Sequence, residues 1–375
     1  MVLKSRESFQ DVLHDIHANG LYRFMYPARY NKQFIYIHKK KLLNLCSNDY
    51  LGIETSLKLS SNQSSSRLLS GNDSMFSKLE KRLATHKSKQ SSLVFPTGYM
   101  ANLGLAGSII QHNDLVISDS LNHASIIDTC KLAGAKVSIY QHNDMNNLQT
   151  KLKSKARKFI ITEGVFSMDG DMANLKQITE LAQKYDAMVI LDDAHGDFVM
   201  GSDGRGTSNL LGVSRKVDIL TSSLSKALGS FGGYIASTND LIDLCINKSK
   251  SFIYTSALPS IHIQDSLLRI NSDRFKRLKI LKKNTKYIQK GLIQCGFDLS
   301  SSTHILPIMI GDEKISMQFS KYMFDRNVFA QAVRYPTVQL NSARIRMSIT
   351  ARLNLKDMDK ILNVVESAGK KFKLI

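Results

Sequence analysis

The amino-acid sequence predicts an α/β protein built around a mostly parallel sheet with helices on both faces. Between about residues 93 and 236, short apolar or β-branched runs alternate with helix-length segments, which is the pattern of βαβ units. The runs are apolar throughout rather than alternating, as expected for strands that are covered on both sides. A length of 375 residues allows this unit and a smaller appended domain.

The first segment, residues 1–45, is predicted to hold one helix and one hairpin. Four apolar residues between Phe9 and Ile16 recur at helical spacing, and Asn19-Gly20 supplies a stop signal. Two short apolar strands at 34–37 and 42–45 flank a basic turn at 38–41.

Residues 46–240 are predicted to form the large domain, with a seven-stranded sheet. Its strands are expected at 93–95, 115–118, 137–140, 159–162, 188–191, 219–221 and 234–236. Residues 241–375 are predicted to contain a linker helix and then a smaller α+β domain, with strands at 305–310 and 345–349 and a final helix at 358–368. The serine-rich stretch 60–66 reads as a surface loop.

Composition limits the class of protein. Hydrophobic residues make up 43% and charged residues 22%, as in ordinary globular proteins. No apolar run approaches the ~18 residues of a membrane span, and Glu7 and Asp11 interrupt any signal-peptide core, so we expect neither membrane insertion nor secretion. Four widely separated cysteines have no metal-ligand spacing, which favours a reduced cytoplasmic protein without a metal site.

The formal net charge of +19 predicts an acidic partner. Nucleic acid is not the expected one, because the basic residues are spread along the chain without an aromatic-interleaved motif. The densest basic stretch, 274–286, reads as an amphipathic helix with a solvated basic face.

Polar residues follow three of the predicted strands, where open α/β sheets bind ligands. Lys226 is the informative one, because a lysine amine can form a Schiff base with a carbonyl cofactor. The hydroxyls of Ser222, Ser223 and Ser225 are candidates to bind a phosphate beside it, and Asp192 at a strand end is a candidate partner for a ring nitrogen. Each residue alone has an ordinary structural explanation. Together, and in this order, they indicate pyridoxal phosphate (PLP).

Several segments carry a family resemblance. They are 47–52 (SNDYLG), 66–71 (SRLLSG), 121–125 (LNHAS), 163–171 (EGVFSMDGD), 192–196 (DDAHG) and 225–229 (SKALG). In these motifs, which extend over nearly the whole chain, the sequence resembles the α-oxoamine synthases. The resemblance implies the PLP-dependent transferase fold of type I and a cytoplasmic homodimer.

Within that family, segments 163–171 and 192–196 most resemble the biotin-pathway branch. That branch condenses L-alanine with a pimeloyl thioester and releases CO2, 8-amino-7-oxononanoate and the free carrier, either coenzyme A or acyl carrier protein. An acidic acyl carrier protein would suit the basic charge. Two alternatives remain: a relative that uses glycine with acetyl-CoA or a longer acyl thioester, and a non-catalytic basic scaffold or nucleic-acid binder. Retention of Lys226 argues against the second.

The resemblance also implies residue roles around the cofactor ring. Lys226 would hold the cofactor and then act as general base and acid, and its pKa of about 10.4 would have to be lowered for this. Asp192 would pair with the ring nitrogen, and His123 would stack on the ring. His195 and Ser167 would hydrogen-bond the ring oxygen or the substrate.

The remaining roles concern the phosphate and the substrates. Backbone N–H groups of Gly98 and Tyr99, at a helix start, and the hydroxyl of Ser223 would bind the phosphate. Thr255 or Ser256 of the partner subunit would reach the same group. The substrate-binding candidates are Arg346 or Arg344 for the amino-acid carboxylate, Asn48 near it, and Arg23 for the acyl substrate.

Three departures from the family pattern are visible. Positions 62–65 lack the glycines that relatives carry, Asp197-Phe198 replaces smaller residues, and 350–353 reads TARL. These changes bear on kinetics and acyl specificity more than on the reaction type.

Overall fold

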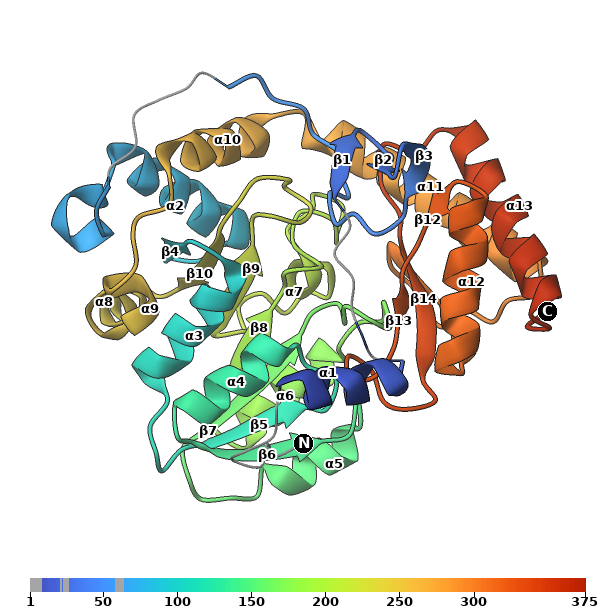
Figure 1. Cartoon of the computed structure of the whole chain (residues 1–375). Helices are drawn as coiled ribbons and strands as arrows, with labels where there is room; N and C mark the ends of the chain where they lie inside the picture. The colour runs from blue at the N-terminus through green and yellow to red at the C-terminus, as the bar shows by residue number, and fades with distance from the viewer. Residues whose placement is uncertain (1–8, 21, 23–26, 58–63) are drawn as a thin grey trace.

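The computed structural model describes residues 9–20, 22, 27–57 and 64–375. Its centre is a seven-stranded sheet in the order β4-β10-β9-β8-β7-β5-β6 (Figure 1). The strands are β4 (Ser91–Phe95), β5 (Leu115–Asp119), β6 (Lys136–Tyr140), β7 (Lys158–Glu163), β8 (Ala187–Asp192), β9 (Ile219–Ser223) and β10 (Gly233–Ser237). Only β10 runs antiparallel to its neighbours, so the predicted, mostly parallel seven-stranded sheet is confirmed.

Helices cover both faces of this sheet, as the uninterrupted apolar strands predicted. Along β8, Val189 and Leu191 belong to one hydrophobic cluster and Ile190 to another, because successive side chains of a strand point to opposite faces. The helices of the first cluster include α2 (Ser74–Lys87), α5 (Met145–Lys151), α6 (Leu175–Lys184) and α10 (Ser260–Asn271). Those of the second include α3 (Gly98–Ile109), α4 (Ala124–Leu132), α8 (Asn239–Lys248) and α9 (Lys250–Ile253).

A smaller α+β unit follows, also as predicted. Its three-stranded sheet has the order β11 (Ile305–Gly311), β14 (Ala343–Ser348), β13 (Ala332–Val333). The helices packed with it are α11 (Arg274–Gln294), α12 (Glu313–Asp325) and α13 (Leu355–Lys371). Outside this unit, the described residues also form two shorter helices, η1 (Arg67–Gly71) and α7 (Thr207–Leu210).

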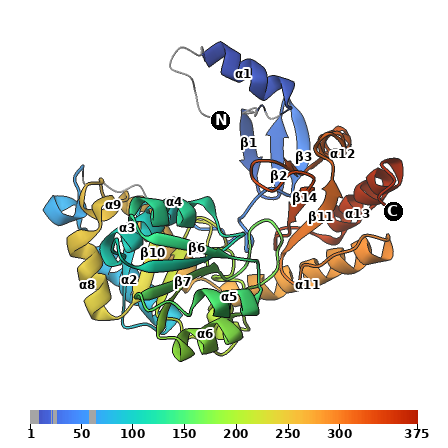
Figure 2. The same cartoon turned by 90° about the horizontal axis from the view of Figure 1, so that it is seen from below.

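The N-terminal segment lies beside this smaller unit (Figure 2). It contains α1 (Phe9–Ala18), β1 (Ala28–Asn31), β2 (Phe34–Ile37) and β3 (Lys40–Asn44). β3 pairs in parallel with β12 (Val328–Phe329), so residues from both ends of the chain share one four-stranded sheet. The division of the chain at residues 45 and 240 stays a prediction.

One local expectation needs correction. The hairpin turn is shorter than predicted, because His38 and Lys39 alone adopt positive φ angles (47° and 65°) while Lys40 already pairs with Ile37. A two-residue turn of this kind matches the twist of the strands. Among the residues described, no helix combines the length and apolar character needed to cross a membrane. Of the serine-rich stretch, residues 60–63 lie outside the described part.

Candidate active site

The polar ends of three parallel strands meet at one edge of the large sheet. Strand pairing places Glu163 beside Asp192 and Asp192 beside Thr221. Lys226 follows β9 by three residues, and segment 163–171 follows β7. The polar segments singled out in the sequence therefore converge, because the carboxyl ends of parallel strands lie at the same edge.

Lys226 is partly buried, with its Nζ 2.8 Å from Nε2 of His195. Burial is the largest influence and lowers the pKa of Lys226, and the Arg346 guanidinium lowers it further. The carboxylates of Asp192 and Glu163 oppose this without cancelling it. The amine at this position is therefore more easily deprotonated than an ordinary lysine, as a nucleophile or general base requires.

A chain of side-chain contacts leads from Lys226 to an arginine. Burial and nearby cations hold the pKa of His195 well below its usual value, so its imidazole is neutral. Its Nδ1 lies 2.8 Å from the hydroxyl of Tyr50, which donates to Oδ1 of Asn48 at 3.0 Å. Arg346 donates to the same oxygen at 3.4 Å. The Tyr50 hydroxyl has a single hydrogen, which it donates to Asn48, so Nδ1 of His195 must donate to the hydroxyl oxygen. In a neutral imidazole the other nitrogen, Nε2, then accepts a hydrogen from the Lys226 amine.

Asp192 is fixed at the end of β8 by two donors. The amide of Asn102 donates to Oδ2 at 2.8 Å, and the backbone N–H of Ala194 donates to Oδ1 at 3.0 Å. Asn102 also donates to Ser125, whose hydroxyl is 2.9 Å from Nδ1 of His123, the residue that caps α4. Burial lowers the pKa of His123, so its ring is uncharged near neutral pH.

The start of α3 packs directly on the end of β9. A Cβ built on Gly98 would lie 3.4 Å from Cβ of Ser223, and one built on Gly233 would lie 2.4 Å from Gly98 itself. The Ser223 hydroxyl is 2.8 Å from that of Ser225. The first-turn N–H groups of Gly98 and Tyr99 have no acceptor within a helix, so this corner offers donors that suit a phosphate.

The three serines do not share one environment. Ser222 donates instead to the buried carboxylate of Asp197 at 2.9 Å, on the opposite face of β9 from Ser223. The side chain of Tyr99 is 42% exposed, and its hydroxyl donates to Asp128 at 2.6 Å.

The two arginines of β14 have different partners. Arg344 is 5% exposed and forms an ion pair with Asp169. Arg346 donates to the backbone oxygen of Ser167 and to the hydroxyl of Ser348 at 2.8 Å, on the side facing Asn48. Arg344 thus has a carboxylate partner within the chain. Among the described residues, Arg346 donates hydrogen bonds to neutral groups only, so its guanidinium is available to bind a substrate carboxylate.

These residues fit PLP. The amine has a lowered pKa, the Asp192 carboxylate is held by neutral donors, and a helix start with hydroxyls lies beside the amine-bearing loop. Among the described side chains, Oγ1 of Thr221 and Oε1 of Glu163 are buried without a hydrogen-bond partner in this same region. Buried polar atoms of this kind are usually satisfied, which is consistent with a polar ligand here.

Sequence reasoning did not single out four further residues of the site: Tyr50, Asn102, Glu163 and His304. Burial and, to a lesser extent, the Asp192 carboxylate raise the pKa of Glu163 to about 8. Burial lowers the pKa of His304 to about 3, and its ring packs edge-on against Tyr50, with centroids 4.0 Å apart. Tyr50 and Glu163 stand inside recognised motifs, whereas nothing local in the sequence marks Asn102 or His304.

Three predicted residues remain outside the cluster described above. Arg23 lies outside the described residues. Thr255 and Ser256 lie in the connection between α9 and α10, and Ser256 is exposed.

Comparison with known proteins identifies the family of this chain. The family described as aminotransferase class I and II matches residues 40–365. The chain belongs to this family. An 8-amino-7-oxononanoate synthase of Thermosipho melanesiensis is 40% identical over 385 residues, covering 98% of each chain. 8-amino-7-oxononanoate synthase 1 of Bacillus subtilis is 39% identical over 356 residues, covering 90% of this chain and 91% of that protein. The solved serine palmitoyltransferase from S. paucimobilis, with a bound PLP–myriocin aldimine, has a TM-score of 0.90 at 25% identity and 96% coverage of both chains.

The family membership confirms the predicted fold class and the PLP cofactor. It also confirms that the protein is an acyltransferase-type enzyme that resembles the 8-amino-7-oxononanoate synthases.

Proposed function

We propose that this protein condenses L-alanine with a pimeloyl thioester, giving 8-amino-7-oxononanoate, CO2 and the free carrier in biotin synthesis. The 40%-identical relatives named for this product support the proposal. The observation that carries it is the line of contacts from the Lys226 amine through His195, Tyr50 and Asn48 to Arg346. These contacts connect an amine with a lowered pKa to a guanidinium through neutral polar side chains, and a guanidinium suits the carboxylate of an α-amino acid.

Lys226 is the proposed general base and acid at Cα of alanine. When bound, PLP supplies an electron sink for the electron pair left at Cα. The lowered pKa lets the Lys226 amine take the proton from Cα, and the neutral His195 keeps the amine oriented by accepting one of its hydrogens. Overall, Cα bonds to the acyl carbon and the C–S bond breaks to release the carrier thiolate. The alanine carboxyl group then leaves as CO2, and Lys226 returns the proton to Cα.

Arg346 is the proposed partner of the alanine carboxylate, with Asn48 beside it. A guanidinium can bind a carboxylate through two parallel hydrogen bonds. Arg344 is assigned a structural role through Asp169. Arg23 keeps its proposed role toward the acyl substrate.

The proposed cofactor contacts follow from the placement of the remaining residues. Asp192 would hold the ring nitrogen protonated, His123 would lie against the ring, and Ser167 and His195 would face its oxygen. Gly98, Tyr99 and Ser223 would bind the phosphate, together with Thr255 or Ser256 of the second subunit in a homodimer.

The test uses the purified full chain with added PLP. Borohydride reduction followed by peptide mass spectrometry should place the pyridoxyl group on Lys226. Incubation with L-alanine and pimeloyl-CoA should give a product with the mass of 8-amino-7-oxononanoate. Lys226→Arg should abolish both results, whereas Lys89→Arg should preserve them. Faster turnover of glycine or serine than of alanine, or of acetyl or long-chain thioesters than of pimeloyl-CoA, would show that the proposed substrates are wrong. A label on another lysine would contradict the assignment.

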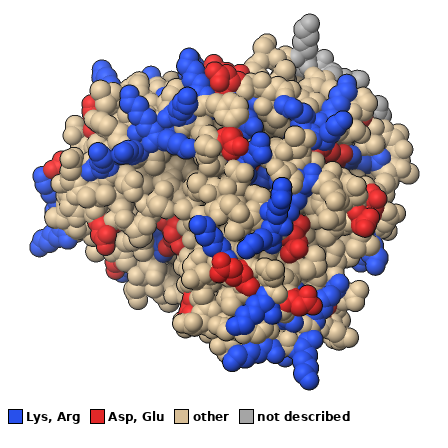
Figure 3. All heavy atoms as spheres, turned by 180° about the vertical axis from the view of Figure 1, so that it is seen from behind, with Lys and Arg blue, Asp and Glu red and all other residues tan. Residues whose placement is uncertain are grey.

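An acyl carrier protein is the proposed acyl donor, and α11 its docking surface. Five exposed lysines recur along one face of this helix at spacings of three and four, and the helix contains no acidic residue. They are Lys276, Lys279, Lys283, Lys286 and Lys290. Figure 3 shows a continuous band of Lys and Arg at the upper left, where α11 lies in that view. Acyl carrier proteins are acidic, so this surface would speed their encounter.

This partner can be tested by charge removal. Changing Lys279, Lys283 and Lys286 to Gln should lower kcat/KM about tenfold for carrier-bound pimelate at low salt, and should leave pimeloyl-CoA unchanged. The control removes equal charge elsewhere, at the exposed Lys153, Lys155 and Lys176. An equal fall with both donors would rule out a docking role.

A further inference from the structure

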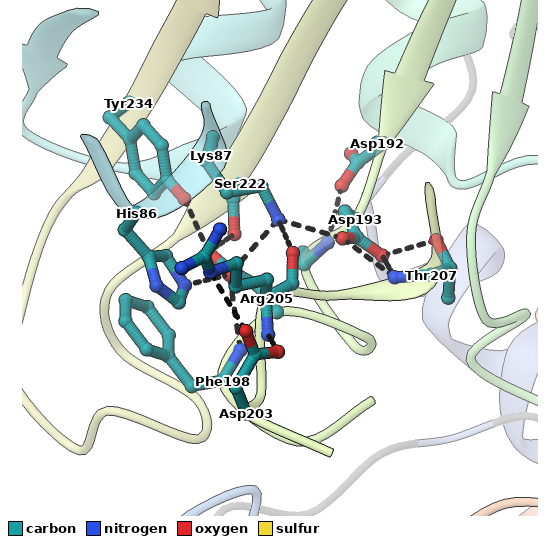
Figure 4. A network of polar contacts seen from close by, with 12 residues as sticks. His86, Lys87, Asp192, Asp193, Phe198, Asp203, Arg205, Thr207, Ser222 and Tyr234 are labelled. Atoms are coloured by element: carbon teal, nitrogen blue, oxygen red, sulfur yellow. Dashed lines mark hydrogen bonds and ion pairs between the residues drawn. The ribbon is translucent and has the colours of Figure 1, made fainter. Parts of the chain in front are cut away.

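A buried lysine lies directly behind the turn that carries two of the proposed cofactor residues. Lys87 ends α2, and its side chain is fully buried. Its ammonium donates to Asp193 at 2.9 Å, to Asp197 at 3.1 Å and to the backbone oxygen of Arg205 at 2.8 Å (Figure 4). An ammonium has three hydrogens, so all of its donors are used.

Asp197 is one of the residues that depart from the family pattern, and its carboxylate is a buried hydrogen-bond acceptor. Oδ1 accepts from Nε2 of His86 at 2.9 Å as well as from Lys87, and Oδ2 accepts from Ser222 and from the hydroxyl of Tyr234. Burial alone would raise the pKa of Asp197, but Lys87 and then His86 lower it well below its usual value. The carboxylate is therefore ionised, and Lys87 is its counter-charge.

Asp193, the other carboxylate that Lys87 contacts, also accepts hydrogen bonds from Thr207. The hydroxyl of Thr207 donates to Oδ1 at 2.7 Å, and the Thr207 N–H and Lys87 donate to Oδ2 at 3.1 and 2.9 Å. A Cβ on Gly196 would lie 2.3 Å from this carboxylate, and one on Gly206 only 1.8 Å away. The backbone at both glycines is therefore packed tightly against this carboxylate.

These two anchors flank the residues that face the cofactor site. Asp193 directly follows Asp192, and His195 lies two residues from each anchor. Within the turn, the N–H groups of Gly196 and Asp197 both donate to the backbone oxygen of Asp193, at 2.9 and 2.7 Å. Moving either anchor must therefore move His195, whose Nε2 is 2.8 Å from the Lys226 amine.

We propose that Lys87 is a positioning residue, which acts through Asp193 and Asp197 to hold turn 192–197 so that Asp192 and His195 keep their places beside Lys226. Lys87 touches neither substrate nor cofactor. The inference rests on the proposed use of Asp192, His195 and Lys226 around PLP.

A purely structural role predicts lost stability alone, so the test needs a readout of the site itself. Lys87→Met keeps the length of the side chain and removes the charge, and Asp197→Asn keeps its shape. In PLP-loaded protein, the pH midpoint of the visible cofactor band should shift by at least half a pH unit in both variants. kcat should fall 10- to 100-fold, while KM for L-alanine changes less than threefold, because Arg346 is untouched.

Lys89→Met is the matched control. Lys89 lies two residues further on and donates to the backbone oxygens of Ser214 and Val217, away from the turn. It should lower the melting temperature and leave the midpoint and kcat unchanged. If Lys87→Met does not fold, the pH midpoint and kcat of Asp197→Asn test the proposal.

Folded variants that retain the parental midpoint and kcat would overturn the proposal. The spectral midpoint does not depend on which substrates are used. A parental protein that shows the cofactor band but does not use L-alanine would overturn the proposed function and leave this inference open to the same test.

Discussion

The amine of Lys226 and Nε2 of His195 are 2.8 Å apart, although they come from different strand ends. Burial lowers the pKa of both groups. Lys226 lowers the pKa of His195 further, and the Arg346 guanidinium lowers the pKa of both. The pair therefore favours a neutral imidazole next to an amine that gives up its proton readily. This arrangement suits proton transfer at a substrate carbon near neutral pH.

Substitution of Arg346 should change the KM for L-alanine, whereas substitution of Arg344 should change the stability of the fold. Arg346→Lys removes the two-pronged geometry, so KM for L-alanine should rise about 10- to 100-fold with little change in stability. Arg344→Met leaves the Asp169 carboxylate without its partner, so it should cost on the order of 1–3 kcal/mol of unfolding free energy and leave KM unchanged. Steady-state kinetics and urea unfolding of both variants check this; a KM effect at Arg344 alone would reverse the assignment.

Tyr50→Phe should affect the site more than the fold. It leaves Nδ1 of the buried His195 without its acceptor, which should lower kcat about tenfold and cost about 1–2 kcal/mol of stability. Tyr322→Phe is the control, since it removes a hydrogen bond of 2.7 Å to Ser367 in the smaller unit. Equal kinetics for both variants would mean that the Tyr50 hydroxyl does not orient His195.

The start of α3 gives a prediction for cofactor affinity. Gly233→Ala would place a Cβ 2.4 Å from the backbone of Gly98 and must displace it, whereas Gly98→Ala makes an ordinary contact of 3.4 Å with Ser223. PLP affinity should therefore fall at least tenfold more in Gly233→Ala than in Gly98→Ala. Fluorescence titration of the cofactor-free variants measures this. The reverse order would place the phosphate elsewhere.

His142 should make stability depend on pH. Its Nδ1 is 2.9 Å from Asp119 and its Nε2 is 2.7 Å from Asp171. Burial lowers the pKa of His142, but the two carboxylates raise it to about 10. Because the folded pKa is above the unfolded value of about 6.5, the stabilisation is complete below pH 6.5 and is lost as pH rises toward 10.

The measurement compares unfolding free energy at pH 6.5 and pH 10 in the parent and in His142→Gln. The parent should lose on the order of 2–4 kcal/mol more than the variant over this range. His112→Gln, at an exposed histidine, is the control and should follow the parent. Parallel curves for parent and His142→Gln would contradict the raised pKa.

The fold was largely predictable because its information is local. Continuous apolar runs such as 159–162 and 188–191 are typical of strands buried on both faces, and each proved to be one. The hairpin turn was predicted to span residues 38–41, but it consists of His38 and Lys39. Its length depends on the φ angles of these two residues, which the lysine-rich sequence does not reveal.

Residues of the site could be predicted only where they lie within recognisable sequence motifs. A period of two puts Arg344 and Arg346 on one side of β14 but cannot show that Asp169 neutralises the first. The contact of Tyr50 with His195 joins residues 145 positions apart, and that of Asn102 with Asp192 joins residues 90 apart. No local spacing encodes such pairs, and the same holds for Lys87 with Asp193.

The pairing of β3 with β12 bears on how the chain is made. The N–H of Gln331 reaches the sulfur of Cys46 across 285 positions, so the N-terminal hairpin has no partner along this edge until most of the polypeptide has left the ribosome. Closing so long a loop is slow. Nascent chains should therefore expose this strand edge for most of synthesis, which makes it the part of the protein that most needs chaperone protection.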